Sequence, residues 1–330
     1  MASIGFQTDF IEAKKGLTVS EPKLNATQTK DRAPVGGAQD GKLDYIHYSV
    51  LLSKSRKFPY YTATNIDGKQ YVRVKRADVF DSGRDEWDED DRAGTFQWGQ
   101  KLYDAPKSYF DRGHMTKRED PQWGASYESA REAAQDTFYF TNCVPQLADL
   151  NQKIWASLET YILSKESVAN KLRINVFTGP VLSKDDPEFV TRVNGVAVQI
   201  PVLFWKVIYY TTDGKALSRV AFIMGQEDLL LSRGIAERRV PARVLDTFFA
   251  PTRNLFMDYE DAETYQVNIK TIETLSGLKF HRAKEPYKDA RPIKLIKKVI
   301  QAKAKKTLMR PSLNPDLSTT LDFKITNLKL

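Results

Sequence analysis

The chain has 330 residues, of which 41% are hydrophobic and 28% are charged, an ordinary composition for a soluble globular protein. Lysine and arginine exceed aspartate and glutamate by 50 to 42, which agrees with a polyanionic partner without requiring one. The single cysteine, Cys143, excludes an intramolecular disulfide and a zinc finger. The length suits one large domain or two smaller ones.

The first residues, MASIGFQTDFIEAKKGLTV, lack the basic region and apolar run of a secretory signal. Nothing in the chain approaches the roughly 18 uninterrupted apolar residues of a membrane span. We therefore expect a chain that is cytoplasmic as synthesised and has no membrane partner.

Residues 1–42 are expected to form an arm and a linker. The stretch from Thr29 to Gly41 is rich in turn-forming residues. Three apolar side chains, Phe6, Phe10 and Ile11, are available to pack a short arm onto the body of the protein.

The pattern becomes strand-like from residue 43. Residues 44–52 and 59–66 are rich in β-branched and aromatic residues, with a polar turn between them. Asp67-Gly68 predicts a hairpin turn into a further strand at 70–74. The same criteria predict later strands at 172–182, 203–210 and 217–224.

An acidic segment covers residues 78–92. Its acidic residues are Asp78, Asp81, Asp85, Glu86, Asp88, Glu89, Asp90 and Asp91. A solvated loop with a helix start explains this composition better than a metal site does. Because dense carboxylates repel a polyanion, we expect this loop to lie away from the path of any polyanionic ligand.

The segment from Tyr109 to Tyr161 carries the chemistry. It contains Asp-Arg-Gly-His, ending at His114, and then Thr-Asn-Cys-Val-Pro-Gln. A neutral imidazole suits a general base because its ordinary pKa lies near physiological pH. Residues 109–111 predict a strand, and Gly113 is expected to let the backbone turn tightly beside the histidine.

A helix is predicted to begin at Asn151 and to carry Glu159. The amide oxygen of Asn151 is a candidate ligand for a hard cation such as Mg²⁺, which prefers oxygen and keeps most of its waters. Asparagine is also favoured at a helix start, and both interpretations can hold together. Glu159 lies eight residues on, about 12 Å along a helix, too far for both side chains to hold one ion directly.

The last segment, 282–330, is strongly basic. The apolar residues Leu295, Ile296, Val299 and Ile300 have helical spacing, so we predict a basic amphipathic helix from Ile293 to Met309. We expect its apolar stripe to dock on the body, with contact to phosphates as a secondary effect. Residues 321–328 alternate like one more strand.

The order of Asp-Arg-Gly-His, asparagine, asparagine and glutamate resembles the DNA/RNA non-specific endonuclease family, which includes endonuclease G and secreted bacterial nucleases. The resemblance covers about 43–281. It implies an α+β fold with a central antiparallel β-sheet flanked by helices and a ββα-metal (His-Me finger) active site. The domain limits become 1–42 for the arm and linker, 43–281 for the nuclease domain and 282–330 for a basic C-terminal extension.

The resemblance also implies roles for single residues. Arg56 best matches an arginine after the first strand that faces the substrate phosphate, and Arg56 or Arg112 would neutralise the developing charge. Asn142 would lie near the metal waters and the scissile phosphate, although an Asx turn before Pro145 explains it equally well. Glu159 would hold a metal-bound water.

The sequence therefore predicts a metal-dependent non-specific endonuclease of DNA and RNA, with His114 as base and Mg²⁺, replaceable by Mn²⁺, as cofactor. Two alternatives stay open: a catalytically silent nucleic-acid-binding protein on a nuclease scaffold, and a nuclease subunit active only within a larger assembly. Because an unrestrained nuclease damages its own cell, we expect an inhibitor, an activating assembly, or delivery to another cell or compartment. A homodimer is also left open.

Overall fold

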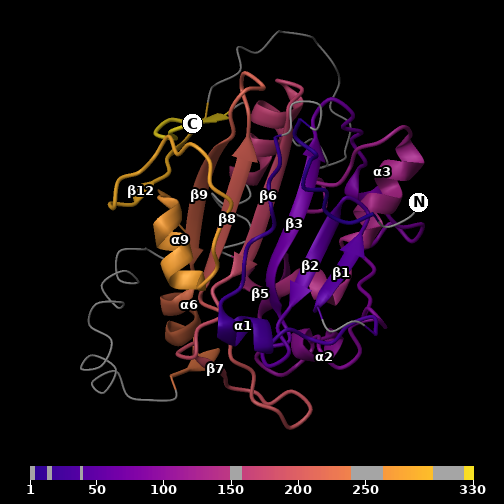
Figure 1. The fold of residues 1–330 in the computed structure, drawn as a ribbon. Helices are drawn as coiled ribbons and strands as arrows, with labels where there is room; N and C mark the ends of the chain where they lie inside the picture. Colours follow the sequence, from indigo (N-terminus) through magenta and orange to yellow (C-terminus); the bar gives the residue numbers. More distant parts are fainter. Residues whose placement is uncertain (1–3, 13–16, 38–39, 149–157, 239–262, 300–322) are drawn as a thin grey trace, which may run out of the picture.

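The structure is a computed structural model, and it describes residues 4–12, 17–37, 40–148, 158–238, 263–299 and 323–330. The described residues form an eight-stranded sheet in the order β1-β2-β3-β6-β8-β9-β11-β12 (Figure 1). Every neighbouring pair in it is antiparallel. Its strands are β1 (Lys42–Tyr45), β2 (Tyr48–Leu52), β3 (Pro59–Asp67), β6 (Arg173–Pro180), β8 (Leu203–Tyr210), β9 (Ser218–Gly225), β11 (Thr264–Val267) and β12 (Ile293–Lys294).

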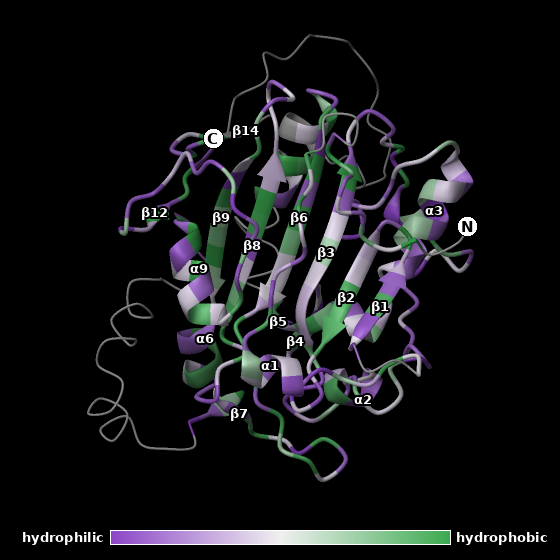
Figure 2. Cartoon of the chain, viewed as in Figure 1, coloured by the Kyte–Doolittle hydropathy of each residue, from purple (hydrophilic) through white to green (hydrophobic). Residues whose placement is uncertain are grey.

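The centre of this sheet is the core of the protein. Strands β3 and β8 read PYYTATNID and LFWKVIYY, and every residue of both is buried. β-Branched and aromatic side chains favour such strands because they pack well on a pleated surface. Hydrophobic residues colour long stretches of β6, β8 and β9 green in Figure 2, whereas β1 at the edge is mostly purple.

Short helices and strands surround the sheet. Helices α6 and α9 lie beside β9, and α3 lies on the β1 side (Figure 1). No helix in the described part of the chain is long and apolar enough to cross a membrane. The helices are α1 (Ala26–Lys30), α2 (Gln100–Tyr103), α3 (Tyr127–Asp136), α6 (Glu227–Ser232) and α9 (Ile269–Ser276), with 3₁₀ or π turns η2 (Arg76–Asp78), η3 (Phe140–Asn142) and η4 (Tyr161–Val168). The other strand pairs are β4 (Phe110–His114) with β5 (Cys143–Leu147), β7 (Glu188–Phe189) with β10 (Ala236–Glu237), and β13 (Lys297–Val299) with β14 (Phe323–Ile325). This arrangement confirms the predicted α+β fold with a central antiparallel sheet.

A small separate core lies beneath α3. The helix begins with a capping box in which the Ser126 side chain accepts a hydrogen bond from the backbone N–H of Ser129. Its buried face carries Ala130 and Ala134, which pack with Val74, Val79 and Phe138. This core fixes the segments on either side of η2 beside strand β4.

The N-terminal arm packs on the body as expected, and the described linker residues do so too. The rings of Phe6 and Phe177 on β6 are 5.2 Å apart, and those of Phe10 and Trp123 are also 5.2 Å apart. Ala33 is completely buried, and its N–H donates to the carbonyl of Leu52 on β2 (3.0 Å). The described part of the linker thus follows the sheet instead of crossing solvent.

The C-terminal segment also docks, but not as a helix. The prediction of a helix over 293–309 is wrong for residues 293–299, where 293–294 form β12 and 297–299 form β13, while 300–309 lie outside the described residues. Between these two strands, Leu295 is buried in the hydrophobic core (1% exposed) and Ile296 is 57% exposed. The strand predicted near the end of the chain is present as β14.

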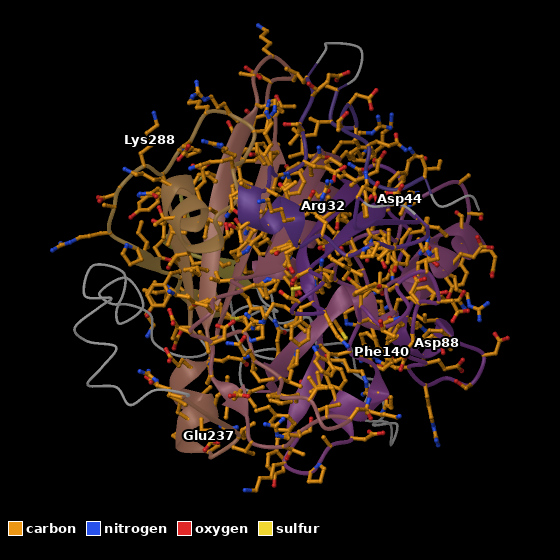
Figure 3. The ribbon with its side chains drawn as sticks, turned by 60° about the horizontal axis from the view of Figure 1, so that its bottom comes forward. Arg32, Asp44, Asp88, Phe140, Glu237 and Lys288 are labelled. Atoms are coloured by element: carbon orange, nitrogen blue, oxygen red, sulfur yellow. The ribbon has the colours of Figure 1, made fainter. Side chains whose placement is uncertain are left out.

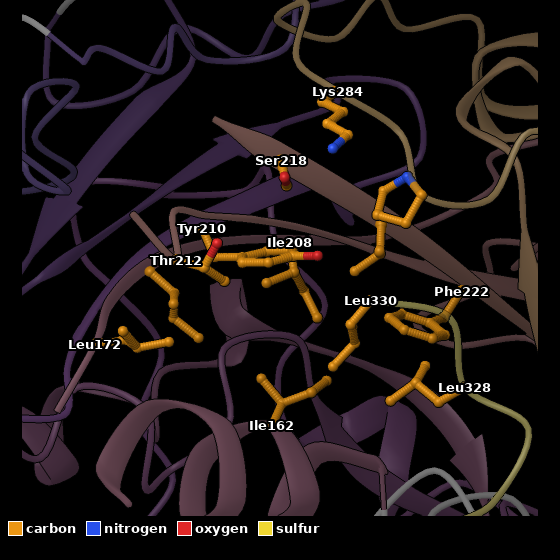
Figure 4. A pocket seen from close by; sticks show the side chains of 13 residues that line it. Ile162, Leu172, Ile208, Tyr210, Thr212, Ser218, Phe222, Lys284, Leu328 and Leu330 are labelled. Atoms are coloured by element: carbon orange, nitrogen blue, oxygen red, sulfur yellow. The ribbon is translucent and has the colours of Figure 1, made fainter. Parts of the chain in front are cut away.

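The last residues cover an apolar cavity on one face of the sheet. The cavity has a volume of about 380 Å³ and is lined by side chains of β6, β8, β9 and η4. Leu328 and Leu330 face Ile162, Ile208 and Phe222 across it (Figure 4). The C-terminal extension is therefore packed against the same sheet as the rest of the chain.

Candidate active site

The Asp-Arg-Gly-His motif occupies strand β4, which pairs with β5 so that His114 lies opposite Cys143. Gly113 is required by close packing: a Cβ atom there would lie 2.2 Å from the side-chain oxygen of Gln146. The predicted tight turn is absent, because the glycine lies within the strand without a positive φ. A buried glutamine from the neighbouring strand is the physical reason for the glycine.

The ring of His114 lies among aromatic side chains. Its centroid is 4.7 Å from the Trp87 ring and 5.0 Å from the Phe138 ring. Its Nε2 atom is buried and has no hydrogen-bond partner. Burial, and then the positive charge of Arg76, lower the pKa of His114 to about 3. The imidazole is therefore neutral at physiological pH, with a ring nitrogen available for a ligand or water.

His114 contributes to a cavity of about 470 Å³ that is rich in charge. Four basic and four acidic side chains line it together with aromatic rings. The lining residues are Arg76, Arg112, Lys117, Arg118, Asp85, Asp111, Glu119, Glu159, Trp87, Phe110, Phe138 and His114. Such a cavity can bind an anion through its basic groups and a hydrated cation through its carboxylates.

Arg112 is in this cavity, as predicted. Its Nη2 donates to Oε1 of Gln100 at the start of α2 (2.7 Å), and its guanidinium carbon lies 5.2 Å from the Tyr103 ring centroid. This arginine thus has one buried donor, its Nε, without a partner among the described residues.

Arg56 is not brought together with His114. It is absent from the cavity lining, and its side chain is 12% exposed. Its guanidinium donates to the carboxylate of Asp186 (2.7 Å) and to the carbonyls of Ser183 and Gln199. The structure therefore does not bring Arg56 to the cavity that holds His114, because its guanidinium forms a buried ion pair with Asp186.

Arg76, and not Arg56, lines the cavity together with His114. It follows β3, the strand that ends at Asp67, instead of β2, and η2 begins with it. The strand predicted for 70–74 is absent, and Tyr71 forms only an isolated bridge with Trp123. An arginine follows both β2 and β3 in the sequence, so only the path of the chain distinguishes Arg56 from Arg76.

Asn142 is a buried brace and does not reach the cavity. Its side chain is completely buried. Its Oδ1 accepts from the N–H of Thr116 (2.9 Å), and its Nδ2 donates to the carbonyls of Thr116 (3.0 Å) and Thr137 (2.9 Å). These bonds engage both the oxygen and the nitrogen of the amide, so the structure places Asn142 as a link between buried backbone segments. Asn142 fixes the backbone two residues after His114.

Glu159 lies in the cavity, whereas Asn151 lies outside the described residues. Helical residues 158–160 lead directly into the π-helical η4. The Glu159 Oε1 atom is 3.4 Å from Nζ of Lys206, a buried lysine on β8 that also donates to Thr178 Oγ1 (2.8 Å). A carboxylate already paired with a cation is better suited to accept hydrogen bonds from waters than to hold a metal ion alone.

The acidic segment contributes to the cavity, contrary to the prediction. Asp85 and Trp87 line it beside His114. A backbone hydrogen bond holds the segment beside the site: the N–H of Phe140 donates to the carbonyl of Asp88 (2.9 Å). The two residues lie close together in Figure 3. Composition alone assigns one environment to the whole segment, although only part of it is solvated.

Three further cavity residues, Lys117, Arg118 and Glu119, lie three to five residues after His114 in the sequence. Arg118 donates to Glu119 and to the carbonyl of Val74 (3.0 Å), which fixes its direction. Their nearness to the motif is the signal in the sequence that points to them.

The geometry agrees with comparisons to known proteins. Residues 26–286 match the sequence pattern of the DNA/RNA non-specific endonuclease family. Because this match covers most of the chain, the chain belongs to that family, and the resemblance found in the sequence is confirmed.

The chain is also similar to individual proteins, two of which are named as nucleases. The mitochondrial endonuclease G of Homo sapiens is 28% identical over 123 residues, which are 36% of this chain and 39% of that protein. The mitochondrial Nuclease 1 of Schizosaccharomyces pombe (strain 972 / ATCC 24843) is 27% identical over 238 residues, 68% of each chain. An uncharacterised protein, y4fB of Sinorhizobium fredii (strain NBRC 101917 / NGR234), is 36% identical over 236 residues, 69% of this chain and 33% of that protein.

The chain thus spans only about a third of y4fB and two fifths of human endonuclease G. Among solved structures, a chain of the EndoG/EndoGI complex superposes with a TM-score of 0.50 and 19% sequence identity, over 72% of this chain and 84% of that chain. This likeness shows a shared fold.

Proposed function

We propose that this protein is a divalent-metal-dependent endonuclease that hydrolyses phosphodiester bonds of DNA and RNA without sequence preference. The observation that carries the proposal is the buried, unpartnered Nε2 of His114 in a cavity lined by four basic and four acidic side chains. Membership of the DNA/RNA non-specific endonuclease family supports it.

His114 would remove the proton from the attacking water. The ring is neutral because burial and Arg76 lower its pKa to about 3, so its Nε2 can accept a proton. A phosphate that binds beside Arg76 would offset that positive charge and raise the pKa of His114 toward the working pH. The base would thus gain strength when the substrate is in place.

The basic side chains would hold the phosphate and stabilise its developing charge. Arg76 is 67% exposed, and Arg112 keeps a buried donor without a partner. Planar guanidinium groups match two oxygens of a phosphate at once. Contacts of this kind recognise the backbone and not the bases, which supports cleavage without a consensus sequence.

The described residues fit a largely hydrated divalent cation. No three His, Cys, Asp or Glu side chains within the described ranges gather closely enough to hold a metal ion. Glu159 would instead hold the ion through water, and Asn151 is the direct ligand predicted from the sequence. When bound, Mg²⁺ or Mn²⁺ would stabilise charge on the phosphate and on the leaving oxygen.

Cleavage of plasmid DNA and of RNA by the purified protein, with Mg²⁺ or with EDTA, tests the proposal. We expect cleavage that EDTA abolishes and that His114→Ala reduces by about 10²–10⁴-fold. His281→Ala makes the same substitution outside the cavity and serves as the control. Near-normal cleavage by His114→Ala, or full activity in EDTA, would refute the proposal.

We also propose that a protein partner or a delivery step restrains the activity, because a free non-specific nuclease damages its host. The neighbouring structure named above is titled as a mechanism of EndoG inhibition, which is a property of that protein. Size-exclusion chromatography with proteins encoded beside this chain would test for a stable inhibitor, and cleavage undiminished by every such protein would argue against one.

A further inference from the structure

One carboxylate of the acidic segment, that of Asp85, lies in the cavity. It forms an ion pair with Arg76. Asp85 and Arg76 both line the cavity. The Nε of Arg76 donates to Oδ1 of Asp85 (3.0 Å), and its Nη2 donates to Oδ2. Two parallel hydrogen bonds from a guanidinium to two oxygens are also what a phosphate forms with arginine. A phosphate cannot take the same two donors while Asp85 holds them.

Two other acidic residues of the segment have partners elsewhere. Asp81 pairs with Arg131 and is 97% exposed. Asp90 pairs with Arg92 and also accepts from the hydroxyl of Tyr45. Asp85 is the carboxylate of residues 78–91 that lines the cavity, so its position there is specific and not a consequence of a generally acidic loop.

The Arg76–Asp85 ion pair can open, so that Arg76 can exchange the carboxylate for another anion. Arg76 is 67% exposed and Asp85 is 25% exposed, so water screens the pair. Arg118, which also contacts a carboxylate in the cavity, is only 12% exposed and is fixed in addition by the carbonyl of Val74. Arg76 is therefore the cavity arginine that can release its carboxylate most easily.

The chain is anchored on both sides of Asp85, and residues 81–84 between the anchors are exposed to solvent. Val79 is completely buried, and the Trp87 ring lies 5.1 Å from Phe138. Within the exposed residues 81–84, a Cβ atom at Gly83, whose φ is +70°, would lie 3.8 Å from the backbone oxygen of Ala77. Asp85 can thus swing away from Arg76 while the anchors keep the segment beside His114.

We propose that Asp85 competes with the substrate phosphate for Arg76. In the free enzyme Asp85 accepts the two hydrogen bonds of the Arg76 guanidinium, and it releases them when the backbone of the nucleic acid binds. This inference rests on the proposed nuclease function, which supplies the phosphate. It identifies Asp85 as a residue that sets substrate affinity: its carboxylate weakens the binding of phosphates and leaves Arg76 correctly aimed between turnovers.

The test is Asp85→Asn, which removes the charge at nearly constant shape. We expect the protein to bind a labelled single-stranded oligonucleotide about two- to fivefold more tightly, the range that an exposed ion pair supports. Fluorescence anisotropy in EDTA measures this binding without cleavage. In steady-state cleavage with Mg²⁺, KM should fall by the same factor. Asp81→Asn removes the same charge from the same segment outside the cavity and should change neither value.

A second pair of variants separates competition from general repulsion. If Asp85 acts through Arg76, Asp85→Asn should give no gain in an Arg76→Ala background, since the two effects are then coupled. Weaker binding by Asp85→Asn, a gain that persists without Arg76, or an equal gain from Asp81→Asn would overturn the proposal. Absence of cleavage by the wild type would count against the nuclease function, while the anisotropy would still report on Asp85.

Discussion

Lys206 offers a sharp test of how the site is held in place. Its side chain is 2% exposed on the central strand β8, and its Nζ lies 3.4 Å from the Glu159 carboxylate, which is 10% exposed. At an effective dielectric constant of about 20, two unit charges at this distance attract by roughly 5 kcal/mol. Lys206→Met keeps the length of the side chain and removes the charge. We expect it to lower the free energy of unfolding by about 3–5 kcal/mol.

The loss of stability in Lys206→Met should depend on pH, because the charge of Lys206 also acts on the buried carboxyl of Asp120. Burial raises the pKa of Asp120 to about 7, and the positive charge of Lys206 opposes that rise. A carboxyl whose pKa is higher in the folded than in the unfolded state loses stabilisation as pH rises through that range. Without Lys206 the folded-state pKa rises further, so Lys206→Met should destabilise the protein more at pH 8 than at pH 5.

Urea unfolding at the two pH values, followed by tryptophan fluorescence, measures both effects. Lys101→Met removes an exposed lysine from α2 and is the matched control. Adding Glu159→Gln to Lys206→Met should restore part of the lost stability, because the buried carboxylate is then no longer left unpaired. A loss below about 1 kcal/mol at both pH values would show that Glu159 and Asp120 are solvated, and it would refute the reasoning.

Two further outcomes follow from the site. Because the pKa of His114 is about 3, its imidazole stays neutral well below pH 6.5, so kcat/KM should not decline between pH 7 and pH 6; initial rates at saturating Mg²⁺ check this, and a fall centred near 6.5 would contradict it. Asn142→Ala removes three buried hydrogen bonds and should lower stability by about 2–4 kcal/mol, seen as a lower melting temperature. An unchanged melting temperature with lost activity would restore the catalytic interpretation of Asn142.

The sequence predicted those parts of the site that lie close together along the chain. His114 and Arg112 share one strand, so a short motif was enough to place both in one cavity. The central sheet was predictable because its strands are continuous runs of β-branched and aromatic residues. Glu159 was placed near the site by resemblance, and the structure adds the lysine that pairs with it.

Other parts depended on the path of the chain. Arg56 and Arg76 each follow a strand, and no local property distinguishes the arginine that forms an ion pair with Asp186 from the one that lines the cavity. Residues 293–299 have apolar side chains compatible with a short helix or with strands, and pairing of β12 with β11 decided between them. Tertiary contacts overrode local pattern in both cases.

Buried polar residues are the hardest for sequence reasoning, and here they determine the geometry of the site. Asn142, Gln146 and Lys206 each have at most 1% of their surface exposed. Each makes or requires a contact with a segment of the candidate site: Asn142 with the backbone after His114, Gln146 with the space beside Gly113, and Lys206 with Glu159. A motif identifies groups that can react, because their chemistry is carried by the side chain itself. A positioning residue has no chemistry of its own, so its role exists only through partners that the fold brings to it.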